Sequence, residues 1–241
     1  MSGLKQLSEM TTEELWRLFP IRLVPHEDKW EKQFEREKIL LEQILQGARI
    51  SHIGSTAVKD IRAKPIVDIL AECADIKTAR TGLEKAGWIC MSESEKRMSF
   101  NKGYTPTGFA TEVFYLHLRG FGDNDEIYFC VYLKEHTEAA REYELLKLRL
   151  WKLYEFDRDA YTSGKGNFVK NIPPRPKACT EKVCGLQRTE IKKGKTNLSY
   201  PFLSMRAPQS VYFFSTFRRP CRRRQVLRAP VRGCPSLRFR S

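Results

Sequence analysis

A small turn, Gly54-Ser55-Thr56, has the residue types that could most directly bind an anion. Backbone amides can approach anionic oxygens closely at Gly54, and the hydroxyls of Ser55 and Thr56 add donors where a helix begins. Because the turn follows an apolar run and precedes a segment that looks helical, we expect a phosphate-binding turn at the positive end of a helix.

A carboxylate follows this turn inside a second apolar run. Asp68 is flanked by Ile66-Val67 and Ile69-Leu70, and burying an aspartate among such residues is costly without a partner. Asp68 could hold a magnesium ion that bridges the same phosphates, and Lys64 would neutralise the remaining charge. In the alternative, Ser55 is a plain helix cap, Asp68 is structural and Lys64 is solvated. The mid-strand position of Asp68 favours the anion site.

The elements that must position these side chains are predicted from hydrophobic periodicity and from capping and turn residues. Strands are expected at 48–53, 66–71, 88–91, 97–101 and 112–119, with a hairpin-like loop at 103–108. Helices are expected after a capping box at 11–14 and at 28–46, 77–86, 124–135, 137–154 and 157–170. This order predicts an α+β domain, a small mixed sheet with helices and a helical C-terminal part.

The basic charge lies almost entirely in the last third of the chain. The net charge is +14, yet residues 171–241 contain 17 Lys+Arg and 2 Asp+Glu, so residues 1–170 are close to neutral. Residues 171–241 also hold eight of the twelve prolines and the basic run 218–224. We expect a disordered tail, or a segment outside its ancestral reading frame. The alternative is an RNA-binding arm.

Composition favours a soluble, cytoplasmic protein. No run of apolar residues is long enough to span a bilayer, and Met1-Ser2-Gly3-Leu4-Lys5 does not begin a signal peptide. Seven cysteines at scattered spacings are typical of reduced thiols. Cys179, Cys184, Cys221 and Cys234 lack the paired spacing of a zinc site.

The Gly-Ser turn followed by an acidic strand looks like the signature of polymerase-β-type nucleotidyltransferases. Those enzymes usually carry a second acid two residues after the first, and that position here is Leu70. Glu72 shares the face of Asp68, but lies roughly 13 Å further along an extended strand. By this comparison, the metal site is incomplete.

Residues 10–170 resemble the GrpB family more fully. The segments that carry the resemblance are 52–58, 63–69, 96–100, 116–118, 125–129 and 158–165. The chain departs from the family pattern at Lys59-Asp60, where Pro-Gly is common, at Tyr115, where a first histidine of a His-x-His pair is common, and after residue 172. The resemblance implies a nucleotidyltransferase-like fold, related to a domain fused to some dephospho-coenzyme-A kinases. It names no substrate.

Three further side chains are candidates for the same site. His117 could be a metal ligand or a general acid/base, or a structural histidine. Arg97 could hold a triphosphate bidentately, or form a surface ion pair. Lys165, one helical turn after Tyr161, could close over a nucleotide, or be solvated.

These residues together predict a GrpB-family nucleotidyltransferase that binds a nucleoside triphosphate with Mg²⁺ and transfers a nucleotidyl group to an unknown acceptor. The expected roles are phosphate binding by Gly54, Ser55 and Thr56, metal binding by Asp68, and charge neutralisation by Lys64, Arg97 and Lys165. The alternative is a non-catalytic nucleotide- or anion-binding module with a degenerate metal site. An RNA-associated protein is disfavoured because residues 1–170 carry no basic excess.

Overall fold

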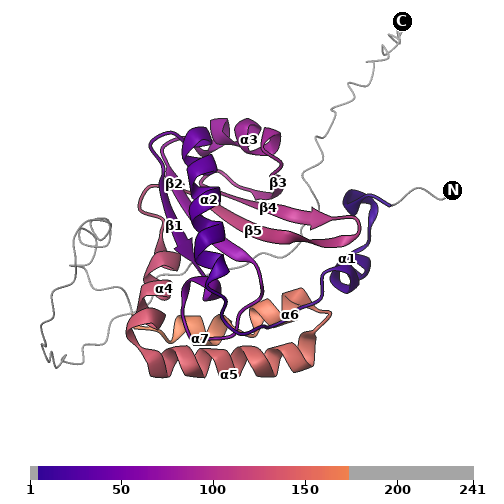
Figure 1. Cartoon of the computed structure of the whole chain (residues 1–241), viewed down its shortest axis with the longest axis vertical. Helices are drawn as coiled ribbons and strands as arrows, with labels where there is room; N and C mark the ends of the chain where they lie inside the picture. Colours follow the sequence, from indigo (N-terminus) through magenta and orange to yellow (C-terminus); the bar gives the residue numbers. More distant parts are fainter. Residues whose placement is uncertain (1–4, 174–241) are drawn as a thin grey trace, which may run out of the picture.

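A five-stranded mixed sheet lies at the centre of the computed structural model, which describes residues 5–173 (Figure 1). The strand order is β1-β2-β5-β4-β3. The strands are β1 (Arg49–Ile53), β2 (Val67–Cys73), β3 (Ile89–Glu93), β4 (Arg97–Thr105) and β5 (Gly108–Gly120). β2 pairs with β5 in parallel, and the other pairs are antiparallel. β5 is therefore the central strand of this sheet, and it pairs in parallel with β2.

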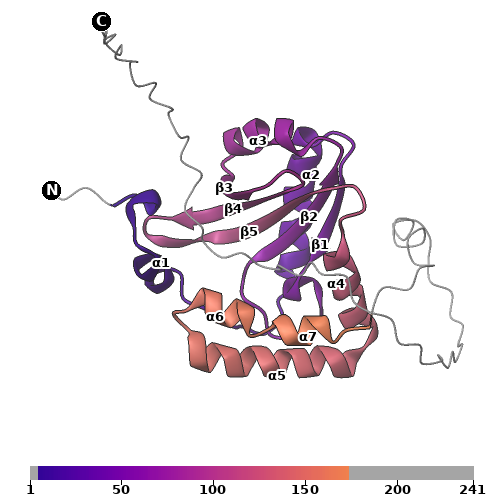
Figure 2. The same ribbon diagram turned by 180° about the vertical axis from the view of Figure 1, so that it is seen from behind.

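Apart from α1, the helices of residues 5–173 lie in two groups. α2 and α3 pack on the sheet, while α5, α6 and α7 form a layer at the bottom of the view, reached through α4 (Figures 1 and 2). Their bounds are α1 (Thr12–Leu18), α2 (Lys29–Ile44), α3 (Ile76–Lys85), α4 (Asp125–Glu135), α5 (Thr137–Tyr154), α6 (Arg158–Ser163) and α7 (Gly166–Lys170). Two short 3₁₀ turns complete the list, η1 (Leu7–Glu9) and η2 (Ser55–Ala57).

The main apolar core lies between one face of the sheet and helices α2 and α3. Alternate residues of β2 and β5, such as Ile69 and Leu116, are fully buried there against α2 residues such as Phe34 and Leu41. Complete burial of one such side chain is worth about 1.5–3 kcal/mol. The residues between them point to the opposite face, because side chains alternate along a strand. That opposite face carries Asp68 and His117.

The predicted α+β class, small mixed sheet and helical C-terminal part are confirmed. The capping box at Thr11 and Glu14 is present, and the helix predicted at 137–154 has those bounds. The predicted loop at 103–108 is shorter, because β4 continues to Thr105 and β5 begins at Gly108. The helix predicted at 157–170 is two helices, which are interrupted around Gly164.

One predicted helix is absent, and the predicted tail lies outside the described residues. The helix expected to begin at Ser55 is wrong, because only the single 3₁₀ turn η2 follows Gly54. Val58 is already extended, and Asp60 has a positive φ of 62° that no helix continues through. From residue 174 onward, the predicted basic tail lies outside the described residues. This part includes the run 218–224 and the four cysteines Cys179, Cys184, Cys221 and Cys234.

Within residues 5–173, no helix combines the length and the apolar composition that crossing a bilayer requires.

Candidate functional site

The turn that begins the site is held in a conformation that requires glycine. Gly54 has φ +71° and ψ −170°, a region that side-chain-bearing residues essentially never occupy. A Cβ atom built at this position would lie 2.4 Å from Asp68 Oδ2. Gly54 therefore allows the backbone turn to touch the carboxylate on β2. Strand pairing fixes this approach, because Ile53 is the register partner of Asp68.

No long helix follows the turn. η2 is only three residues long, so a helix dipole contributes little there. Instead, Lys147 of α5 donates a hydrogen bond to Ser55 Oγ at 2.9 Å and another to the carbonyl of Arg62. Thr56 Oγ1 lies 3.0 Å from Nε2 of His52, whose ring stacks on Phe34. The positive character of the site must therefore come from side chains.

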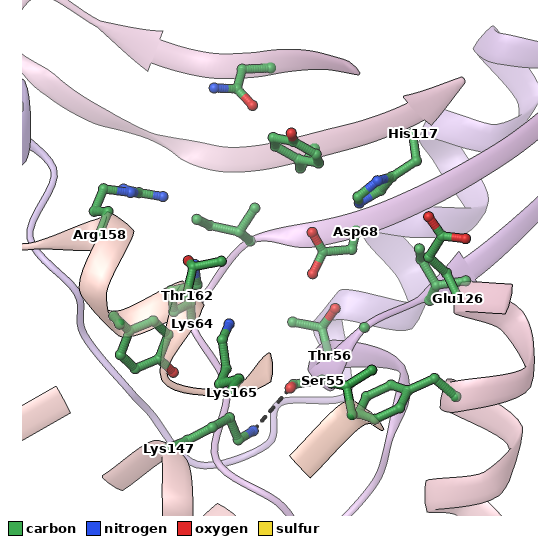
Figure 3. Close-up of a pocket in the computed structure, with 18 of the residues that line it drawn as sticks. Ser55, Thr56, Lys64, Asp68, His117, Glu126, Lys147, Arg158, Thr162 and Lys165 are labelled. Atoms are coloured by element: carbon green, nitrogen blue, oxygen red, sulfur yellow. Dashed lines mark hydrogen bonds between the residues drawn. The ribbon is translucent and has the colours of Figure 1, made fainter. Parts of the chain in front are cut away.

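Four cationic side chains line one pocket together with Asp68 (Figure 3). They are Lys64 before β2, Lys147 of α5, Arg158 of α6 and Lys165 before α7. The predicted residues Gly54, Ser55, Thr56, Asp68 and His117 line the same pocket. Its volume of about 100 Å³ holds several water molecules or a phosphate-sized group. The carboxylates in this lining are Asp68 and Glu126, so cations outnumber them.

Aromatic rings and carbonyls partly compensate the burial of these cations. Lys165 Nζ lies 4.6 Å from the ring centroid of Tyr161, and Lys64 Nζ lies 5.6 Å from it. Lys147 Nζ lies 5.0 Å from the centroid of Tyr143. Arg158 donates to the carbonyl of Phe19 at 3.0 Å and to the Tyr104 hydroxyl at 3.2 Å. These contacts fix the positions of the cations and leave a net positive pocket.

Burial in the pocket lowers the pKa values of its lysines and raises that of Asp68, which favours the neutral form of each group. Burial is the main cause of a lysine pKa of about 7 at Lys147 and about 8 at Lys165. Burial and the cations of Arg158 and Lys165 hold the pKa of Lys64 well below its usual range. Burial raises the pKa of Asp68 to about 6, against the opposing effect of Lys64. An anion in this pocket would favour the charged lysines.

The lowered pKa of Lys147 predicts how the free energy of unfolding responds to pH. The Lys147 pKa is about 7 in the native protein and 10.5 for an ordinary lysine, so the unfolded chain binds more protons between these values. Stability therefore rises with pH in this window. Relative to Lys147→Met, the wild-type protein should gain about 2 kcal/mol in unfolding free energy between about pH 7 and pH 9. Urea unfolding at each pH measures this difference.

Lys152→Met is the matched control, because Lys152 is exposed on the same helix. Its unfolding free energy should follow the wild-type pH curve. Parallel curves for Lys147→Met and wild type would contradict the lowered Lys147 pKa.

His117 is positioned as a neutral hydrogen-bond donor. Arg119 Nη2 lies 3.0 Å from His117 Nδ1, and a guanidinium can only donate, so Nδ1 accepts. In the neutral ring the proton is then on Nε2. Burial and the Arg119 and Arg97 cations hold the His117 pKa well below its usual range. This state suits donation to a ligand oxygen better than proton abstraction.

Arg97 and Glu72 do not line the pocket. Arg97 forms a bidentate ion pair with Asp123, at 2.6 and 2.5 Å. The surface ion pair foreseen as its alternative role is the one observed. Glu72 accepts hydrogen bonds from Gly122 N at 2.8 Å and Asn124 Nδ2 at 3.0 Å, ahead of α4. Glu72 thus orders a turn and does not complete a metal site with Asp68.

The donor set at the site suits Mg²⁺ only in a limited way. Residues 5–173 contain no cluster of three or more Asp, Glu, His or Cys side chains able to hold a metal. Mg²⁺ commonly binds through one or two carboxylates together with substrate phosphates. Asp68 fits that arrangement for one ion. A site that holds metal without phosphate does not fit these residues.

Sequence reasoning missed several side chains of the pocket. Lys147 lies on the buried face of α5 with Tyr143 and Leu150, and a lysine at this helical spacing among apolar residues was a readable signal. Arg158 lies in the segment 158–165 that carries the family resemblance. Glu126 lies in the segment 125–129, which also carries the resemblance, whereas Asn101 had no such signal, because only strand pairing brings it to the pocket.

Comparisons with known proteins agree with this architecture. The model of the GrpB protein family matches residues 20–175, and the chain belongs to this family. The glutamate-rich protein GrpB of Alkalihalophilus pseudofirmus is 36% identical over 161 residues, which cover 62% of this chain and 92% of that protein. A UPF0157 protein of Pseudomonas aeruginosa is 34% identical over 168 residues, covering 66% of this chain and 69% of that protein.

A solved structure from the same family is also similar to this chain. The crystal structure of GrpB from Enterococcus faecalis aligns with a TM-score of 0.54 and 28% identity, covering 69% of this chain and 98% of that chain. A structure of the Cid1 poly(U) polymerase aligns with a TM-score of 0.39 and 10% identity, covering 59% of this chain and 45% of that chain. The latter similarity is too low to carry an argument about activity.

Proposed function

We propose that this protein binds a nucleoside triphosphate with Mg²⁺ in the pocket around Asp68 and transfers a nucleotidyl group from it. The observation that carries the proposal is the group of four buried or half-buried cations around one carboxylate and a glycine turn. A polyphosphate is the ligand chemistry that such an excess of positive charge recognises. The family resemblance to nucleotidyltransferases points to the same ligand class.

Each residue has a defined part in this proposal. Lys147, Arg158 and Lys165 neutralise phosphate oxygens, and the neutral His117 donates a hydrogen bond. Gly54 lets a phosphate approach the backbone beside Asp68. When bound, Mg²⁺ would be held by Asp68 and phosphate oxygens and would stabilise developing charge. An acceptor oxygen attacks the α-phosphorus, and the bond from that phosphorus to the oxygen that bridges to the β-phosphorus breaks. Pyrophosphate leaves with the electron pair, and the proton of a hydroxyl acceptor passes to solvent water.

The second candidate is a nucleotide- or anion-binding module without catalysis. Leu70 favours it, because this apolar residue is fully buried where a second metal-binding acid would be expected. Both candidates share the cationic pocket. They differ in whether a covalent bond to the α-phosphorus is made.

Thermal unfolding of the full-length protein tests the shared step. Nucleoside triphosphates at about 100 times their Kd should stabilise the fold by about 2.7 kcal/mol. Asp68→Asn should abolish the part of the Tm increase that requires Mg²⁺ and keep the Mg²⁺-independent part. Asp159→Asn, at an exposed position of α6, is the matched control and should behave like wild type.

The outcomes separate the candidates. No Tm increase with any of ATP, GTP, CTP or UTP would rule out the transferase and a module that binds nucleotides. Recovery of label from α-³²P nucleotide on a product other than the nucleotide decides for the transferase. Tm increases without such a product, across cell-extract acceptor fractions, decide for the binding module.

A further inference from the structure

Two buried oxygen atoms at the pocket have no hydrogen-bond donor among residues 5–173. They are Oδ1 of Asn101 on β4 and Oε2 of Glu126 on α4. Both side chains line the pocket, with exposed fractions of 2% and 4%. The other carboxylate oxygen of Glu126 lies 3.4 Å from Arg119 Nη2. Buried acceptors of this kind are uncommon in folded proteins and cost free energy unless a donor reaches them.

These acceptors cannot be satisfied by phosphate. An ionised phosphate offers only acceptor oxygens, which match the cations of Lys147, Arg158 and Lys165. An amide oxygen and a carboxylate oxygen need O–H or N–H groups instead. In Figure 3, Glu126 lies on the opposite side of Asp68 from these cations. The pocket therefore combines cations, which suit anions, with two buried acceptors, which suit hydrogen-bond donors.

Strand register places Asn101 relative to Asp68. Asn101 pairs with Tyr115, and Tyr115 pairs with Asp68, so the three residues form a row across β4, β5 and β2. Adjacent strands are about 4.8 Å apart, which places Asn101 about 10 Å from Asp68. Tyr115 lies between them and also lines the pocket. A ligand that reached from Asp68 to Asn101 would therefore extend beyond a single phosphate group.

We propose that Asn101 and Glu126 form a subsite for hydroxyl or amino groups of the ligand whose phosphates the cations hold. This inference rests on the proposed phosphate binding and assigns residues to the part of the ligand beyond its phosphates. The ligand is a phosphorylated compound with hydrogen-bond donors, such as a nucleotide, and not inorganic polyphosphate. Asn101 and Glu126 thus select the organic part of the ligand.

Isothermal titration calorimetry on the full-length protein with Mg²⁺ tests the subsite, using ATP, GTP, CTP and UTP against inorganic tripolyphosphate. The wild-type protein should bind at least one nucleotide about 10-fold or more tightly than tripolyphosphate. Asn101→Leu and Glu126→Gln should each reduce this preference about 3- to 10-fold while tripolyphosphate affinity stays unchanged. Glu135→Gln, exposed on the same helix as Glu126, should keep the wild-type preference.

Tripolyphosphate binding also shows that each variant is folded and that its pocket cations are in place. Equal affinity of tripolyphosphate and all four nucleotides would overturn the subsite and leave the proposed phosphate binding in place. A parallel loss of both affinities in Asn101→Leu and Glu126→Gln would also overturn it. Absence of binding by every probe would overturn the proposed function and the subsite together.

Discussion

Replacing Gly54 with alanine should lower the free energy of unfolding by about 3 kcal/mol. The new Cβ atom would lie 2.4 Å from Asp68 Oδ2, and the backbone φ of +71° disfavours any residue with a side chain. Relief requires moving either the turn or Asp68, whose strand is paired on both sides. Nucleotide-dependent stabilisation should therefore be lost as well. Urea unfolding with and without ATP and Mg²⁺ measures both effects.

Gly47→Ala separates backbone strain from the collision with Asp68. Gly47 has a similar φ of +74°, but no atom lies within 4 Å of a Cβ built there. We expect this control to cost only about 1 kcal/mol and to leave nucleotide binding intact. Equal losses of stability in the two variants would contradict the close approach of Gly54 to Asp68.

Replacing Lys165 with methionine should weaken nucleotide binding and strengthen the unliganded fold. A charge-assisted hydrogen bond to phosphate is worth about 1.5–3 kcal/mol, so the Kd should rise about 10- to 100-fold. Without ligand, methionine removes a cation for which burial and repulsion by Arg158 outweigh the attraction to Asp68, and it keeps an apolar stem against Tyr161. We therefore expect unfolding free energy to increase by about 1 kcal/mol. Calorimetry and urea unfolding give the two values.

Opposite signs for binding and stability distinguish a ligand-binding lysine from a structural one. Lys152→Met, at the exposed position used above, should change neither quantity by more than about 0.5 kcal/mol. If Lys165→Met destabilises the unliganded protein and leaves Kd unchanged, Lys165 serves the fold and not the ligand.

The sequence was sufficient for most of the fold because its periodic signals are local. The apolar spacing of α2 and α5 and the capping box of α1 each lie within one element. The length of η2 was not predictable in the same way, since a Gly-Ser turn starts a 3₁₀ turn or an α-helix equally well. The left-handed Asp60 and the extended Val58 decide this point, and both depend on how the loop packs against α5.

The site was predictable in part for a related reason. Lys64, Asp68 and the Gly54 turn are close in sequence, so their spacing suggested a shared pocket. Lys147 and Arg158 reach that pocket only when the C-terminal helices pack under the sheet. Arg97 carried the right charge, but Asp123 lies within reach and binds it. Charge alone cannot tell which acidic partner, phosphate or carboxylate, an arginine will meet.

The hydrogen bond from Lys147 to Ser55 joins residues 92 positions apart in the chain. Taken alone, the segment from Gly54 to Asp68 contains as many acidic as basic side chains among its pocket residues, Asp68 and Lys64. The excess of positive charge comes from α5, α6 and Lys165, which reach the pocket only after the strands and helices between β2 and α5 have folded. The proposed anion binding would therefore be a property of the finished fold, and a fragment ending at β5 should have the motif without the affinity.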